Sequence, residues 1–476
     1  MYSAQQLSFE LVPPTLSSHT FDAVLDHVQA NSDHFTATTS KAMSRELGQV
    51  FTPLAMSKQL SELLPEQAIP SHHCQLADLG AGTGMLSVCV AAKIATTESA
   101  PALSIMGFET DRRMESAWQQ AWQRFEACGQ QAIEQALYGD FTEQAASLLR
   151  TGTMANLPKP RIIQTNPPYQ KLRRDSELSQ TLRDAGIPVT NLYAAFVALG
   201  VCWLEEGGEL LAILPRSFAS GDYFKPFRAW LSERMSIEHV VLYRSRTNFK
   251  NVLQESVLVR MTKKPEQSTS IRITVADTPT DPKPEYDLLM PASNVLSQQG
   301  WWLPRGAADI EHINRNRLRP NTLASKGITM STGKVELHRL KGSEMTTLLY
   351  AKDFDGNGAI TWGETRKPRY VTTVEAQRLT LPASGGFVGL KRISANDGPN
   401  PQRLFPVVLT QATLGMEEIA IENHVQILSR NGDPFTEQDA HELAAMLASV
   451  EANSVVRSFS GTTQINKSDL ATLRLN

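Results

Sequence analysis

A glycine-rich turn between a buried strand and a helix constrains the fold of this chain more than any other feature. The segment LADLGAGTGMLS, residues 76–87, passes from an apolar strand pattern through G-x-G-x-G into an apolar helix pattern. Glycines at Gly80, Gly82 and Gly84 allow positive φ angles and a close approach of the backbone to a ligand. The turn is not the dinucleotide-binding G-x-G-x-x-G, because Met85 occupies the place of its last glycine. Such a turn indicates an α/β fold that binds a ligand at the carboxyl ends of its strands.

Strand and helix patterns alternate on both sides of this turn, from residue 74 to residue 263. The alternation predicts a mostly parallel, doubly wound, Rossmann-like sheet covered by helices. Proline-rich and polar segments then interrupt the pattern, and mixed α+β patterns follow them. We therefore predict an N-terminal extension at 1–44, an α/β catalytic domain at 45–265, a linker at 266–300 and a mixed α+β domain at 301–476.

The composition excludes several classes of protein. No run approaches the roughly 20 apolar residues of a membrane span, and the first residues lack the basic and apolar parts of a secretory signal. The four cysteines are isolated and show no C-x-x-C spacing, which argues against a metal site and for a reduced, cytoplasmic setting. The formal net charge is −3, yet residues 305–405 hold 16 Lys and Arg against 9 Asp and Glu. This excess of seven positive charges indicates phosphate binding, although a solvated basic face would explain it equally.

Acidic residues follow the strands next to the glycine turn. Glu109 ends the second strand, where it can accept hydrogen bonds from ribose hydroxyls. A third strand ends in Tyr-Gly-Asp-Phe, so that Asp140 can bond an adenine amino group beside the ring of Phe141. No phosphate-binding lysine follows the turn, which argues against ATP. These features favour S-adenosylmethionine, and the residues predicted here to bind it are Asp78, Gly80, Gly82, Glu109, Asp140 and Phe141.

The segment IIQTNPPYQKL, residues 162–172, predicts the catalytic group. The chain must leave the sheet at Pro167, which lacks an N–H and fixes φ, so Asn166 stands at the carboxyl end of the strand. The Asn166 side-chain oxygen and the Pro167 carbonyl can each accept one N–H of an exocyclic amine and localise its lone pair. This work is positioning, so no strong general base is required. Tyr169 offers a face for a planar base that has left the duplex, and the predicted catalytic residues are Asn166, Pro167, Pro168 and Tyr169.

Several motifs in one order resemble those of the N6-adenine DNA methyltransferases of the gamma arrangement, which carry the catalytic domain first and the target-recognition domain last. They are GQVFTP at 48–53, FETDRRM at 108–114, GDF, NPPY and NFKNVLQESVLV at 248–259. The resemblance implies that Phe51 and Thr52 contact the methionine part of the cofactor. It also implies that Phe249 packs on the flipped adenine opposite Tyr169, although a core aromatic would explain Phe249 as well.

The second half is similar to the BsuBI/PstI-type restriction–modification methylases in LLYAKDFDGNGAITW, FVGLKRISANDGPNPQRLFPVVL, ENHVQIL and SFSGTTQINKSDLATL. RISAND departs from the subgroup pattern. The resemblance implies methylation of adenine in a specific double-stranded DNA sequence, a separately encoded restriction endonuclease that shares the site, and a bacterial cytoplasmic, nucleoid-associated location. The expected DNA contacts are Lys391, Arg392, Arg403, Ser460 and Thr462.

Other functions remain open at this point. NPPY after a glycine turn also occurs in methyltransferases of RNA bases and of protein glutamine amides, whose planar nitrogens pose the same chemical problem. A non-catalytic DNA-binding scaffold is a further alternative. DFDGNGAITWGE, residues 353–364, fits an EF-hand loop. We interpret it as a hairpin turn, because the flanking segments are short, β-prone or interrupted by Pro368. We therefore predict no metal site.

Overall fold

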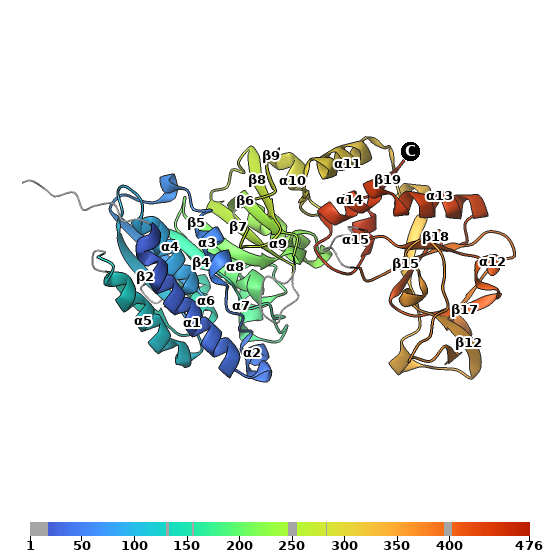
Figure 1. Cartoon of the computed structure of the whole chain (residues 1–476), viewed down its shortest axis with the longest axis horizontal. Coiled ribbons are helices and arrows are strands. Elements are labelled where there is room, and N and C mark those ends of the chain that lie inside the picture. Colours follow the sequence, from blue (N-terminus) through green and yellow to red (C-terminus); the bar gives the residue numbers. More distant parts are fainter. Residues whose placement is uncertain (1–17, 130–132, 155–156, 246–254, 282, 395–401) are drawn as a thin grey trace, which may run out of the picture.

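The computed structural model describes residues 18–129, 133–154, 157–245, 255–281, 283–394 and 402–476. Figure 1 shows two halves side by side, an N-terminal half built on one large sheet and a C-terminal half that contains smaller sheets. No helix within the described ranges is long and apolar enough to cross a membrane.

The described part of the N-terminal half forms a nine-stranded sheet in the order β3-β2-β1-β4-β5-β7-β6-β8-β9. Strands β3, β2, β1, β4 and β5 are parallel, and β7 pairs antiparallel with both β5 and β6. The predicted α/β fold with a mostly parallel sheet is therefore confirmed. The strands are β1 (His73–Leu79), β2 (Ala102–Phe108), β3 (Glu134–Tyr138), β4 (Ile162–Thr165), β5 (Glu209–Pro215), β6 (Met235–Tyr243), β7 (Ser256–Lys263), β8 (Ser270–Ala276) and β9 (Tyr286–Pro291).

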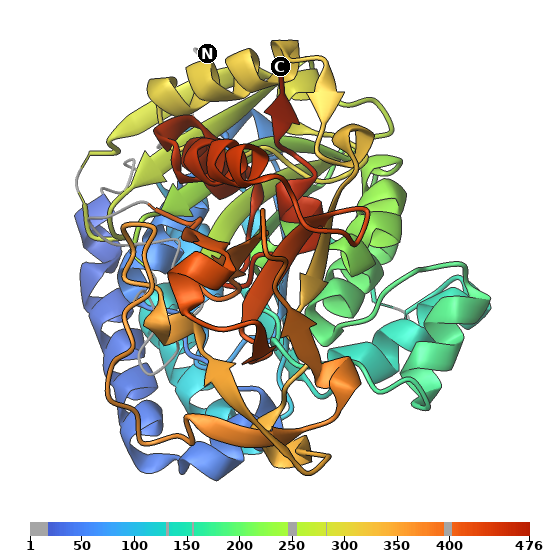
Figure 2. The same ribbon diagram turned by 90° about the vertical axis from the view of Figure 1, so that its right-hand side faces the viewer.

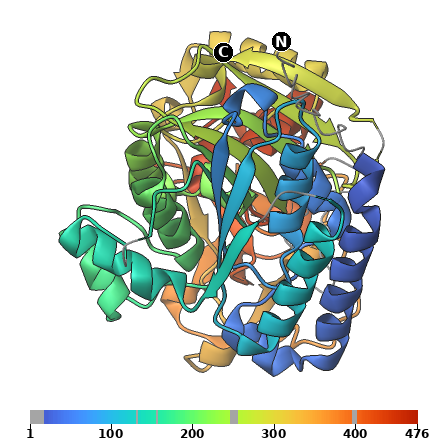
Figure 3. The ribbon, with the colours of Figure 1, turned by 90° about the vertical axis from the view of Figure 1, so that its left-hand side faces the viewer.

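Helices cover both faces of this sheet, as a doubly wound fold requires. One hydrophobic cluster joins the sheet to α1, α3, α4 and α5, and another joins it to α6, α8 and α9. In Figure 3 the blue and teal helices lie on one side of the blue strands and green helices lie on the other. The helices are α1 (Asp22–Thr38), α2 (Lys41–Leu47), α3 (Leu54–Ser61), α4 (Met85–Ala95), α5 (Glu115–Glu126), α6 (Phe141–Thr151), α7 (Glu177–Asp184), α8 (Leu192–Trp203) and α9 (Lys225–Ser232).

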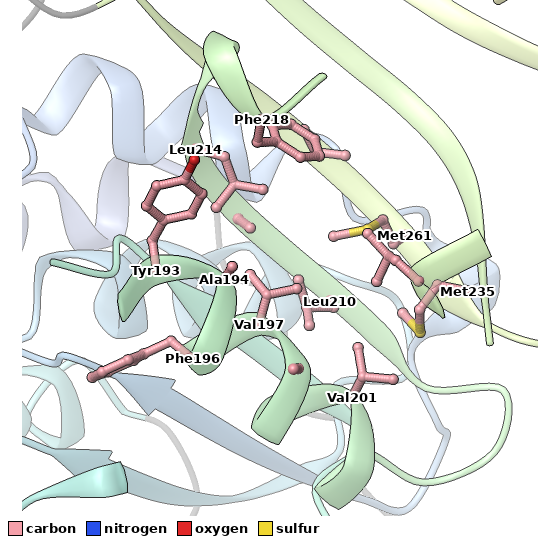
Figure 4. Packing of buried hydrophobic residues seen from close by; sticks show 14 of the residues in the cluster. Tyr193, Ala194, Phe196, Val197, Val201, Leu210, Leu214, Phe218, Met235 and Met261 are labelled. Carbon is pink, nitrogen blue, oxygen red and sulfur yellow. The ribbon is translucent and has the colours of Figure 1, made fainter. Parts of the chain in front are cut away.

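Helix α8 packs against the middle of the sheet and holds its strands in place. Its sequence is apolar on all sides, and nearly every residue of it is buried. Figure 4 shows Val197 and Val201 of α8 facing Leu210 of β5, with Met261 of β7 beyond it. A helix that is apolar all round must be enclosed by the core. This packing fixes β4 and β5, whose carboxyl ends carry the segments of greatest interest.

One predicted domain boundary is wrong. The range 266–300 is not a linker, because β8 and β9 extend the large sheet through it and α10 (Ala292–Val295) follows. The proline-rich segment only connects these two strands. The described part of the predicted N-terminal extension belongs to the catalytic core, since α1 packs on α4 and α5 and buries Val24, Leu25 and Val28. Tertiary burial of these elements was not visible in their local composition.

The C-terminal half is mixed α+β, as predicted. Its described strands form two four-stranded sheets, β11-β18-β15-β16 and β13-β12-β17-β14, and β10 pairs with β19. Residues 437–459 form two helices, because the extended backbone at Ser449 separates them and the Ser449 side chain caps the second. The strands are β10 (Asn321–Thr322), β11 (Ile328–Thr332), β12 (Glu344–Leu349), β13 (Tyr370–Thr373), β14 (Arg378–Thr380), β15 (Phe387–Lys391), β16 (Pro406–Leu409), β17 (Glu418–Ile421), β18 (Val425–Arg430) and β19 (Arg474–Leu475). The helices are α11 (Ala307–Leu318), α12 (Gln411–Leu414), α13 (Glu437–Ala448), α14 (Val450–Phe459) and α15 (Lys467–Leu470).

A buried cluster of five charged residues joins the two halves, and we call it the charge cluster. Arg216 follows β5 directly and donates to Glu255 at 2.5 Å and to the Arg457 carbonyl at 2.7 Å. Arg305 also donates to Glu255. Asp309 of α11 accepts from the Arg305 backbone N–H and from the Arg457 guanidinium, both at 2.9 Å. The end of β5 is therefore tied to the helices of the C-terminal half.

The EF-hand-like segment is a turn, as interpreted from the sequence. Phe354 and Ile360 form an antiparallel bridge that closes it. Asp353 is buried and accepts two hydrogen bonds from Arg369, at 2.6 and 2.9 Å. Asp355 accepts from the backbone N–H groups of Asn357 and Ala359. The first two carboxylates of the EF-hand pattern thus already accept hydrogen bonds from groups of the protein.

Candidate active site

A cavity of about 280 Å³ opens at the carboxyl ends of β1, β2, β3 and β4. The strand order reverses between β1 and β4, and ligands bind at such switch points in open α/β sheets. Three groups of residues line the cavity: the segment before α3, the glycine turn, and residues that follow strands. They include Phe51, Thr52, Gly80, Gly82, Glu109, Asp140, Phe141, Asn166 and Pro168, all of which were predicted from the sequence.

The glycine turn is strongly bent and is tied to the neighbouring strand. Gly80, Gly82 and Gly84 have φ angles of 94°, 54° and 92°, which L-residues with side chains rarely adopt. The backbone N–H groups of Gly80 and Ala81 both donate to the Phe108 carbonyl at the end of β2, at 3.0 and 2.8 Å. The glycine turn therefore faces the cavity with backbone atoms that no side chain covers.

Glu109 is oriented by the turn and keeps unused acceptor capacity. One carboxylate oxygen accepts from the Gly82 N–H at 2.9 Å, and the other accepts from the Asp111 N–H at 2.8 Å. The Thr110 hydroxyl also donates to the oxygen that faces Asp111, at 3.5 Å. A carboxylate has about four acceptor sites, so acceptor capacity remains for a ligand, mainly on the oxygen bonded to Gly82. Burial raises the pKa of Glu109, despite these hydrogen bonds. The geometry fits a pair of ribose hydroxyls.

Asp140 is held in the same way by the start of α6. Within the described residues its hydrogen bonds all reach Oδ1, from the Thr142 N–H and hydroxyl at 2.7 Å and from the Glu143 N–H at 3.3 Å. Oδ2 therefore remains for a ligand donor such as an adenine amine. Phe141 next to it is only 2% exposed and packs on Phe108 at 5.3 Å between ring centroids. It reaches the cavity from the core rather than as an exposed stacking ring.

The prediction that Asp78 contacts the ligand is corrected by the structure. Asp78 is fully buried, accepts from the Ser87 hydroxyl and does not line the cavity. Burial raises its pKa to about 7. Because it lies at the end of β1 and bonds to α4, it supports the glycine turn from behind.

Asn166 enters the cavity with its amide orientation fixed. Its Nδ2 donates to the Thr52 hydroxyl at 2.9 Å and to the Val50 carbonyl at 3.3 Å. A carbonyl can only accept, so the nitrogen must face this segment and Oδ1 is left for the cavity. The preceding Thr165 hydroxyl donates to the Leu79 carbonyl at 2.6 Å, which ties β4 to β1.

The rest of the Asn-Pro-Pro-Tyr segment is anchored on both sides. The Tyr169 hydroxyl donates to the Ile213 carbonyl of β5 at 3.2 Å, and burial raises the pKa of Tyr169. Gly48 packs so closely on the other side that an added Cβ would lie 2.8 Å from the Cβ of Pro168. Phe249, the predicted partner of Tyr169, lies outside the described residues.

Comparison with known proteins identifies the family. The model of the Eco57I restriction-modification methylase family matches residues 161–249. The type II methyltransferase M.BsuBI of Bacillus subtilis is 30% identical over 458 residues, which cover 90% of this chain and 87% of that protein. The type II methyltransferase M.PstI of Providencia stuartii is 27% identical over 469 residues, covering 92% and 88%. The chain belongs to the type II methyltransferases of restriction–modification systems.

Family membership confirms a DNA methyltransferase of a restriction–modification system. The alternatives of an RNA or glutamine methyltransferase and of a non-catalytic scaffold are therefore set aside. Among solved structures, the type IIL restriction–modification enzyme MmeI in complex with DNA has a TM-score of 0.52 at 11% identity, covering 95% of this chain and 67% of that one. This last likeness concerns the fold alone.

Sequence reasoning missed several residues that line the cavity of this methyltransferase. Ser32 comes from α1, and its hydroxyl lies 2.7 Å from that of Thr83 in the glycine turn. Leu192 and Phe196 come from α8, and Gln170 follows the catalytic segment. Helix α1 has a polar Ser32 on its otherwise apolar buried face, which is the sequence feature that could have placed it here.

Two of the five predicted DNA contacts are corrected. Arg403 and Ser460 are fully buried, and Arg403 donates to the Ser460 hydroxyl at 3.1 Å and to the Thr462 carbonyl at 2.6 Å. Both hold the C-terminal core together and cannot reach DNA. Lys391, Arg392 and Thr462 are partly exposed and stay predictions.

Proposed function

We propose that this methyltransferase methylates the N6 amine of an adenine that has been extruded from a specific double-stranded DNA sequence. The observation that carries the proposal is the fixed amide of Asn166. Its nitrogen is committed to Thr52 and Val50, so its oxygen faces the cavity. The carbonyl of the next residue, Pro167, would supply a second acceptor. Two adjacent acceptors match the two N–H groups of one exocyclic amine.

The polar groups of the cavity match those of the cofactor. Glu109 offers its remaining acceptor capacity to ribose hydroxyls, and Asp140 Oδ2 offers an acceptor to an adenine amine. Phe51 and Thr52 lie next to the glycine turn, where the methionine part would be held. When bound there, S-adenosylmethionine supplies an electrophilic methyl group. The protein contributes binding, orientation and exclusion of water.

Asn166 and Pro167 act on the target amine. The lone pair of an adenine amine is delocalised into the ring, so the neutral amine is a poor nucleophile. When both N–H groups donate to the two acceptors, the nitrogen moves toward tetrahedral geometry and its lone pair points toward the methyl donor. Preorganised dipoles of this kind stabilise the transition state without a general base. Tyr169, whose hydroxyl is anchored on β5, would stack on the base, and Phe249 is proposed as the opposite face.

The C-terminal half would read the target sequence, since the catalytic half already supplies the cofactor and base pockets. Its partly exposed Lys391, Arg392 and Thr462 are candidate DNA contacts. A separately encoded restriction endonuclease that recognises the same site would complete the system. DNA methylated by this protein should then resist that endonuclease.

The test is to identify the methylated base. DNA from a host that lacks its own DNA methyltransferases and expresses this protein is digested to nucleosides and measured by mass spectrometry. N6-methyladenine above the empty-vector control is expected, and single-molecule sequencing should place it in one motif. N4-methylcytosine or C5-methylcytosine without N6-methyladenine would overturn the adenine assignment.

A further inference from the structure

A short basic strip begins at the rim of the cavity, directly after the catalytic segment. Lys171, Arg173 and Arg174 are exposed. Gln170, which precedes the strip, lines the cavity together with Leu192, and the Leu192 N–H donates to the Gln170 carbonyl at 2.9 Å. Three cations thus lie within eight residues of Asn166 along the chain.

The backbone of this basic strip is fixed while its side chains face solvent. Lys171 forms an antiparallel bridge with Asn191. The Arg173 carbonyl accepts from the Ser176 hydroxyl at 2.8 Å, and the Arg174 carbonyl accepts from the guanidinium of Arg183 at 3.1 Å. Figure 2 shows the teal and green segment that contains α7 projecting from the catalytic half beside the C-terminal half. The basic strip is therefore an exposed surface on a segment whose backbone is held in place.

The charges of the basic strip are not neutralised by the protein. Several basic residues of the catalytic half have an acidic partner, for example Arg150 with Glu177 and Arg260 with Glu209. None of Lys171, Arg173 and Arg174 takes part in an ion pair within the described part of the chain. Asp175 is the one acid inside the strip, so two net positive charges remain over residues 171–175.

We infer that the basic strip binds the DNA phosphates next to the extruded adenine, an inference that rests on the proposed function for the location of that base. Three unpaired cations on a fixed backbone complement a phosphodiester chain, and an extruded base brings its flanking phosphates to the rim of the cavity. These contacts are independent of sequence, because phosphates carry no base information. The strip would hold the opened strand while the C-terminal half selects the site.

The test measures DNA affinity against salt for Arg173→Ala/Arg174→Ala in the full chain. Each phosphate contact contributes about 0.9 to the slope of log K against log salt, so the slope should fall by about 1.8. A fluorescent duplex that carries the methylated motif should show this loss, and a duplex of random sequence, from which no target base is extruded, should show a smaller one. The KM for DNA should rise while kcat at saturating DNA stays unchanged, since neither side chain lines the cavity.

The matched control is Arg124→Ala/Lys159→Ala, which removes two exposed cations near the amino ends of the strands, away from the cavity. Its slope should match that of wild type. The inference is overturned if the two double variants change the slope equally, or if the strip variant leaves the slope for the motif duplex unchanged. Because the slope counts phosphate contacts and not methyl transfer, it still reports on the strip if the protein methylates a base other than adenine.

Discussion

The cavity and the charge cluster both place acidic side chains at the same edge of the sheet, but these side chains serve different purposes in the two regions. In the cavity, Glu109 and Asp140 are oriented by backbone N–H groups and keep unused acceptor sites. In the cluster, Glu255 accepts from Arg216 and Arg305, and both arginines are almost fully buried. Burial lowers the pKa of Arg305 to about 10, which still leaves it charged near neutral pH.

This difference separates residues that bind a ligand from residues that join the two halves of the protein. A carboxylate oriented by backbone amides at the cavity is preorganised for a ligand, whereas one shared by buried guanidinium groups is committed to those groups. The cluster follows β5, whose Ile213 carbonyl holds Tyr169, so the C-terminal half is attached within a few residues of the catalytic segment. We infer that the cluster sets the position of the DNA-reading half relative to the base pocket.

The largest effect is expected from breaking the cluster. Glu255→Ala leaves Arg216 and Arg305 buried without their shared carboxylate, which should lower the free energy of unfolding by about 3–5 kcal/mol. Urea denaturation measures this. The control is Glu177→Ala, whose exposed pair with Arg150 at 3.8 Å should contribute at most about 1 kcal/mol. Equal decreases in the free energy of unfolding for the two variants would contradict the distinction between the buried and the exposed ion pairs.

A smaller effect is expected from Glu109→Ala, which should weaken S-adenosylmethionine binding by about 1–3 kcal/mol because ligand donors lose their partners. Titration calorimetry measures the dissociation constant. Glu126→Ala, at an exposed position on α5, serves as the control and should bind the cofactor normally. Unchanged affinity in the Glu109 variant would show that this carboxylate serves the turn and not the ligand.

The smallest effect concerns pH. The pKa of Glu109 is raised by burial, so its carboxylate takes up a proton at a higher pH than an ordinary glutamate. A protonated carboxyl accepts hydrogen bonds less well, so cofactor affinity should fall as the pH drops through this raised pKa. Calorimetry between pH 8 and pH 5 should show the decline in wild type and its absence in Glu109→Gln. A parallel decline in both proteins would assign it to another group.

Local sequence patterns predicted the parts of the molecule that local chemistry determines. The glycine turn requires positive φ, and Pro167 ends β4, so both could be located without a structure. Alternating strand and helix patterns gave the parallel sheet for the same reason. The candidate site followed because the carboxyl ends of neighbouring parallel strands must meet at one edge.

Features that depend on tertiary packing could not be predicted in this way. Arg403 is a basic residue in a basic segment, which suggests a DNA contact. Only the surrounding fold shows that it is buried against Ser460. The proline-rich connection between β8 and β9 resembled a linker because β8 joins the sheet by pairing with β6, and β9 then adds to β8 as the last strand of the order. The charge cluster escaped notice because its members are spread from residue 216 to residue 457.

The central claim is that the Asn166 oxygen acts on the target amine in the transition state. The most direct test is the transfer of labelled methyl groups to duplex DNA by Asn166→Ala, together with its affinities for cofactor and DNA. We predict that kcat falls by at least about 10²–10³-fold while both dissociation constants stay near those of wild type. Thr52→Ala, which removes one of the two acceptors of the amide nitrogen and keeps Asn166 itself, should lose less activity. Wild-type turnover in Asn166→Ala would contradict the account.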